Sequence, residues 1–185
     1  MRRPRGGWCT VVVVAALVVL AAPAAAVAAA KTVPVKAWSG SVCKDFSRWE
    51  VQLTRLGATG AVANPTAGKA AITKFFTGAI KATDRLAKDL KAAGVPAVKH
   101  GTAIAAAFAS SVKSLRGAYA KAKTSAAALP TGDPATFAAA AQALATQLQT
   151  TGSTLTTTLA QTTTQYPASA LDKAFTSTKA CKTVA

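Results

Sequence analysis

Apolar side chains recur at intervals of three and four residues along most of this chain, and proline or glycine ends each such stretch except the last. The first stretch begins at Val42 and continues through Phe46, Trp49, Leu53 and Leu56. Because an α-helix turns once every 3.6 residues, this spacing puts the apolar side chains on one face of a helix, ready to pack against other helices. We therefore predict an all-α fold.

Two of the predicted helices carry a clear start signal. Asn64-Pro65 and Asp133-Pro134 each combine a capping side chain with a proline suited to the first turn of a helix. The apolar spacing continues from these points, which predicts helices over residues 65–93 and 134–165. The second of these segments contains no charged residue, and its polar side chains are Thr, Gln and Ser.

The remaining helices are predicted from the same spacing. A third is expected from about residue 97 to 129, and a short fifth from 168 to about 183. We expect residues 31–40 to form an extended leader, with Ser39 or Ser41 capping the first helix. Trp38, in this leader, is expected to pack on the bundle; insertion into a membrane interface is the alternative.

Helix lengths suggest the architecture. The three long helices have about 30 residues each, or roughly 45 Å at 1.5 Å per residue, and short connections make sequential helices antiparallel. The first and fifth helices are about half as long. We therefore predict an antiparallel, four-helix-bundle-like domain over residues 41–185, in which the first and fifth helices share one bundle position end to end. Cys43 and Cys181 would then meet near mid-height.

The N-terminal segment carries the features of an export signal. Arg2, Arg3 and Arg5 precede an apolar run, which ends in a tract of small residues before Lys31. This order is typical of a secretory signal peptide, here residues 1–30, with cleavage expected after Ala30. A retained membrane anchor is the alternative, but the strongly apolar part is shorter than the roughly 20 residues that span a bilayer. We expect a secreted or envelope-associated protein with no membrane span after cleavage.

Two cysteines remain beyond the signal, Cys43 and Cys181. An even number of cysteines in an exported chain favours a disulfide, which can persist outside the cytoplasm. Two free thiols or metal ligands are the alternative, but a metal site needs further ligands and the only histidine, His100, has no partner pattern. No cofactor is expected.

The chain is strongly basic. It holds 22 Lys and Arg against 6 Asp and Glu, a net charge of +16, and stays at +13 without the three signal arginines. Such a charge favours anionic partners, and for an exported protein these are anionic lipid or cell-wall polymer in preference to nucleic acid. The candidate anionic-partner face is made of residues on the second and third helices: Lys74, Lys81, Arg85, Lys88, Lys113 and Arg116. A solvated surface without a partner is the alternative.

Catalytic patterns are missing from the sequence. Asp45 and Glu50 are five residues apart and point to different sides of a helix, as do Asp84 and Asp89. His100 lacks a nucleophile and an acid in any known arrangement, and the chain has no glycine-rich phosphate loop and no CxxC motif. We therefore expect no enzymatic activity.

Three segments carry a loose resemblance. SVCKDFSRWEVQL opens the domain, LRGAYAKAK lies in its middle, and LDKAFTSTKAC lies near its end. Together with the alanine-rich signal, they resemble small secreted actinobacterial helical proteins of unknown function. The resemblance implies an extracytoplasmic helical bundle and assigns no functional residue.

Three functions remain open at this point. The first is a non-enzymatic binding or scaffolding role in the cell envelope. The second is binding of anionic membrane lipid or cell-wall polyanion by the cationic side of the bundle. The third is carriage of a small apolar ligand inside the bundle, which requires a cavity.

Overall fold

The computed structural model describes residues 31–57 and 64–182, so the predicted signal peptide at 1–30 lies outside the described residues.

The two longest helices both begin at a capping side chain. In α2 (Pro65–Ala93), Asn64 Oδ1 accepts a hydrogen bond from Ala67 N at 2.9 Å. In α4 (Pro134–Gln165), an Asp133 carboxylate oxygen accepts from Thr136 N at 2.7 Å. Both helices thus begin at the predicted caps.

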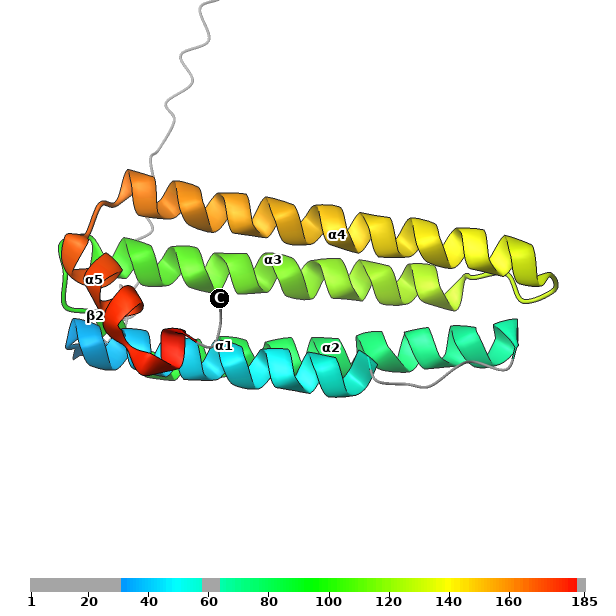
Figure 1. The fold of residues 1–185 in the computed structure, drawn as a ribbon, viewed down its shortest axis with the longest axis horizontal. Helices are drawn as coiled ribbons and strands as arrows, with labels where there is room; N and C mark the ends of the chain where they lie inside the picture. Colours follow the sequence, from blue (N-terminus) through cyan, green and yellow to red (C-terminus); the bar gives the residue numbers. More distant parts are fainter. Residues whose placement is uncertain (1–30, 58–63, 183–185) are drawn as a thin grey trace, which may run out of the picture.

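Successive helices run antiparallel and form a bundle (Figure 1). α1 (Val35–Gly57) lies along the second half of α2, and α3 (Gly101–Ala127) packs between α2 and α4. The all-helical, bundle-like fold predicted from the apolar spacing is confirmed. α1 ends short of the far end of the bundle, whereas α2, α3 and α4 continue to it (Figure 1).

The first helix begins earlier than predicted. Residues 35–40 were expected to be extended, but α1 already starts at Val35, and Trp38 N donates to Pro34 O at 2.9 Å. The reason is burial of Trp38, which is 2% exposed and packs edge-on against Phe108 and Phe175. This confirms that Trp38 packs on the bundle.

The extended segment is therefore confined to the residues before Pro34. β1 (Thr32–Val33) pairs in parallel with β2 (Val95–Pro96), in the connection between α2 and α3. Gly94 has φ +76° and lies so close to the Lys31 carbonyl that a side chain would collide with it. Because this connection is paired with β1, α3 begins at Gly101 and not at residue 97.

The C-terminal segment lies beside the start of α1. It consists of α5 (Ser169–Ser177) and a short 3₁₀ helix, η1 (Lys179–Cys181). Cys43 and Cys181 form a disulfide, as predicted, with their Cα atoms 4.9 Å apart. The expected end-to-end arrangement is not found: α1 and α5 pack side by side at the end where α1 begins (Figure 1). The disulfide consequently lies toward that end of the bundle.

Two apolar clusters fill the bundle, one toward each end. The cluster near the disulfide is built around Trp38, Val42, Leu86, Ile104 and Leu171. The other combines residues of α2, α3, the turn after α3, and α4, and three of them are alanines: Phe76, Ala79, Leu115, Tyr119, Ala122, Ala126, Leu129 and Leu144. The alanines at these positions let the long helices approach closely.

Candidate anion-binding surface

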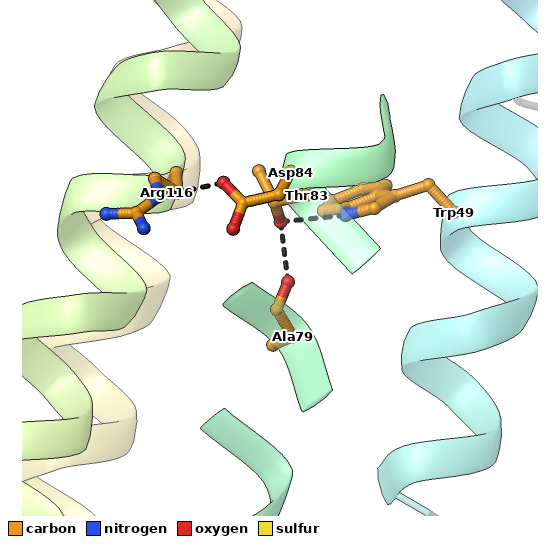
Figure 2. A network of polar contacts seen from close by, with 5 residues as sticks. All are labelled: Trp49, Ala79, Thr83, Asp84 and Arg116. Carbon is orange, nitrogen blue, oxygen red and sulfur yellow. Dashed lines mark hydrogen bonds and ion pairs between the residues drawn. The ribbon is translucent and has the colours of Figure 1, made fainter. Parts of the chain in front are cut away.

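Two neighbouring residues of α2 hold α1 and α3 in place through polar contacts (Figure 2). Thr83 Oγ1 accepts a hydrogen bond from Trp49 Nε1 of α1 at 3.1 Å and donates to Ala79 O at 2.8 Å. Asp84 accepts from Arg116 Nε of α3 at 2.9 Å. The Asp84–Arg116 pair thereby engages one of the cations predicted to face an anionic partner.

Arg48 of α1 forms ion pairs with one acid of its own helix and one acid of α2. Arg48 lies 3.2 Å from an Asp45 carboxylate oxygen and 3.1 Å from an Asp89 carboxylate oxygen. Burial raises the pKa of Asp45, and the nearby Asp89 charge raises it further, while Arg48 acts in the opposite direction. The Arg48–Asp89 pair therefore links α1 to α2, whereas the Arg48–Asp45 pair lies within α1.

Five cations surround two adjacent hollows on the outer side of α1 and α2. One hollow, of about 370 Å³, is lined by Arg55, Lys81 and Arg85. The other, of about 750 Å³, is lined by Lys69, Lys74 and Lys81. No acidic residue lines either hollow. We call this set the basic surface: Arg55, Lys69, Lys74, Lys81 and Arg85.

Lys81, Leu56 and Gly78 contribute to both hollows. Leu56 packs directly on Gly78, because a Cβ at position 78 would lie only 2.5 Å from Leu56 Cδ2. This close approach brings the end of α1 down onto α2 and carries Arg55 toward Lys81 and Arg85. Within the described residues, none of the five basic side chains forms an ion pair with an acid, so their charge is free to meet an external anion.

Only some of the six residues predicted to form an anionic-partner face lie together around the hollows. Lys74, Lys81 and Arg85 line the hollows, whereas Lys88 and Lys113 are exposed but line neither. Arg116 bonds to Asp84. Arg55 and Lys69 were missed, although Gly57 marks the end of α1 in the sequence and places Arg55 in its last turn.

Other types of site find little support in the described ranges. There, no group of three or more His, Cys, Asp or Glu side chains could hold a metal ion. None of the described helices is long and apolar enough to cross a bilayer. His100 is exposed and lies with its ring 5.5 Å from that of Tyr166. Comparisons with protein-family models, curated proteins and solved structures found no match for this chain.

Proposed function

We propose that this chain is an extracytoplasmic, non-enzymatic binding protein whose basic surface engages phosphate or carboxylate groups of the cell envelope. The observation that supports this most is the gathering of five cations around two connected hollows that no acid lines. Elsewhere on α1 and α2, Arg48 and the acids Asp45, Asp84 and Asp89 are already paired. Binding of an anion at the basic surface therefore breaks no existing ion pair.

The chemistry of the two cation types suits a repeating or crowded anion. Arg55 and Arg85 present planar guanidinium groups that can grip two oxygens at once, while the lysines act as mobile point charges. Each cation close to an anionic lipid surface contributes about 1 kcal/mol. The excess of positive charge over the whole chain also speeds approach to such a partner at low salt.

The local contribution can be separated from the overall charge by two matched variants. The first replaces three residues of the basic surface, as Arg55→Gln, Lys74→Gln and Lys81→Gln. The control replaces three exposed lysines that line neither hollow, as Lys99→Gln, Lys121→Gln and Lys173→Gln. Both variants lower the net charge by the same amount, so a difference in affinity between them reports on position.

Affinity is measured by co-sedimentation with phosphatidylglycerol-containing vesicles and by titration with soluble polyglycerol phosphate. We expect the basic-surface variant to lose about a hundredfold in affinity and the control less than about tenfold. Binding by the wild-type chain should also weaken when salt is raised from about 0.05 M to about 0.5 M, since screening shortens the reach of exposed charges. Equal losses in the two variants, or binding that salt leaves unchanged, would reject the proposal. Comparison of the two probes identifies lipid or polymer as the source of the anion.

A further inference from the structure

An apolar groove opens where α1 ends. It has a volume of about 320 Å³ and lies between the end of α1, the first half of α2 and the first half of α4. Its walls carry only apolar side chains and glycine, among them Leu56, Ile72, Phe75, Phe137, Ala141 and Leu148. The groove falls within the usual size range of ligand sites and has the apolar lining typical of them.

The helix lengths explain why the groove exists. α1 stops at Gly57, but α2, α3 and α4 extend farther, so the far end of the bundle lacks α1 (Figure 1). α2 and α4 approach each other at Gly68, where a Cβ would lie 2.6 Å from the Phe137 ring. Ile72, Phe75 and Phe137 along the groove are only partly buried.

The groove is elongated along α4. Its lining residues there extend from Phe137 to Leu148, which is about 16 Å at 1.5 Å per residue. An elongated apolar ligand suits this length.

The basic surface begins directly beside the groove. Leu56 lines the apolar groove and also both basic hollows. Leu56 is the one described residue that the groove shares with the hollows, so a ligand in the groove reaches Arg55 and Lys81 by passing the Leu56 side chain. Since cations and no acid line the two hollows, the charge beyond Leu56 is complementary to an anionic headgroup and repels a cationic one.

We propose that the groove binds the single hydrocarbon chain of an anionic amphiphile, with its carboxylate or phosphate headgroup at Arg55 and Lys81. The headgroup contact rests on the proposed function, whereas the chain site stands on the groove itself. The chain is recognised by burial of apolar surface, which is worth about fourfold in affinity for each added methylene. The ligand class is that of fatty acids and single-chain phospholipids.

Two substitutions on the same helix test the chain site. Ala141→Phe places a ring in the groove, whereas Ala139→Phe adds the same ring at an exposed position of α4 that does not line it. The probes are octanoate, decanoate and dodecanoate below their micelle concentrations, with dodecyltrimethylammonium as the cationic counterpart of the longest. Binding is measured by isothermal titration calorimetry, and folding of each variant by circular dichroism.

We expect saturable binding that strengthens about fourfold per methylene from octanoate to dodecanoate. Ala141→Phe should lose at least about tenfold in dodecanoate affinity, Ala139→Phe should match the wild type, and dodecyltrimethylammonium should bind much more weakly. Intermolecular nuclear Overhauser effects between the chain methylenes of dodecanoate and the Phe75 and Phe137 rings test the chain site on the wild type, without any variant.

The outcomes separate this inference from the proposed function. If the wild type takes up no dodecanoate, or if Ala141→Phe binds it as well as Ala139→Phe does, the chain site is rejected, and polyglycerol phosphate binding is unaffected by that result. If dodecanoate binds in the groove but the basic-surface variant and the cationic probe behave like their controls, the anionic headgroup assignment is wrong.

Discussion

Leu56 near the end of α1 lies against Gly78 of α2, with a separation that leaves no room for a Cβ at position 78. This contact seats the last turn of α1 on α2. It also places one side chain at the boundary between the apolar groove and the basic hollows. The candidate site therefore depends on the absence of a side chain at Gly78 as much as on the cations around it.

Gly78→Ala should behave differently from Gly117→Ala, a matched change on α3 where an added Cβ meets nothing within 4 Å. Both exchanges remove the helix penalty of glycine, which is worth about 0.5–1 kcal/mol. Gly117→Ala should gain that amount in the free energy of unfolding, measured by urea denaturation. Gly78→Ala must move Leu56 and should be neutral or destabilising, with weaker dodecanoate binding. Equal stabilisation by both would contradict the Leu56–Gly78 contact.

The hydrogen bond from Trp49 to Thr83 ties α1 to α2 (Figure 2). Thr83→Val keeps the shape of the fully buried side chain but leaves the indole N–H without its acceptor, which should cost about 1–3 kcal/mol. Thr77→Val is the control, since the Thr77 hydroxyl donates only to Thr73 O within α2. Chemical denaturation should show little change for Thr77→Val. A Thr83→Val variant as stable as the wild type would mean that this bond contributes little.

The Cys43–Cys181 disulfide closes a loop with a sequence separation of 138 residues. By the chain-entropy relation, its removal should lower the free energy of unfolding by about 4–5 kcal/mol. Thermal unfolding of the wild type with and without reductant checks this, alongside the double variant Cys43→Ala and Cys181→Ala. Reductant should shift the wild type toward the variant and leave the variant unchanged. Recovery of two free thiols from the native protein would disprove the disulfide.

Asp45 should make stability depend on pH in an unusual direction. Its pKa is raised above the ordinary 3.8, chiefly by burial and also by Asp89, so the ionised carboxylate is disfavoured in the folded state. This unfavourable contribution is present at neutral pH and is relieved as the pH falls through the folded-state pKa. Asp45→Asn should therefore be more stable than the wild type at pH 7, and the difference should vanish below about pH 3.8.

Asp133 should make stability depend on pH in the opposite direction to Asp45, because its pKa is lowered. Hydrogen bonds from the Thr136 hydroxyl and backbone N–H lower the pKa of this carboxyl group. Its stabilising contribution is present above pH 3.8 and is lost as the pH falls through the lower, folded-state pKa. Urea denaturation of Asp133→Ala should show a loss at pH 7 that shrinks in acid. If both Asp variants shifted stability in the same direction at pH 7, the two pKa assignments could not both hold.

Local signals were sufficient to predict much of the fold. The start of α2 follows from Asn64-Pro65 and that of α4 from Asp133-Pro134, because a capping side chain and a proline act within one turn of the chain. The disulfide partners followed from the predicted export signal and the number of cysteines beyond it. These features require no knowledge of what each helix packs against.

The placement of α1 and α5 could not be predicted in this way. α1 starts at Val35 because Trp38 is buried by Phe108 and Phe175, which lie far away in the sequence. The side-by-side packing of α5 on α1 likewise arises from tertiary contacts. Helix lengths alone allow an end-to-end arrangement equally well, so they led to the wrong position for the disulfide along the bundle.

Only the residues of the candidate site that lie together on one helix, α2, could be predicted from the sequence. Lys74, Lys81 and Arg85 could be predicted from the helical spacing of α2 alone. Arg55 lies near them only because its neighbour Leu56 packs on Gly78 of α2. Arg116 was included because its distance to Asp84, across two helices, is not visible in the sequence. The apolar groove depends in the same way on where α1 stops relative to α4.

The most direct test of the central claim is to map anion contacts residue by residue on the wild-type chain. Backbone amide shifts are followed by nuclear magnetic resonance during titration with polyglycerol phosphate at low salt. The account predicts the largest changes around Arg55 and along α2 from Lys69 to Arg85, with small changes at the exposed lysines Lys113 and Lys121. Changes of similar size at all exposed lysines would contradict a gathered anion-binding surface and indicate diffuse charge attraction.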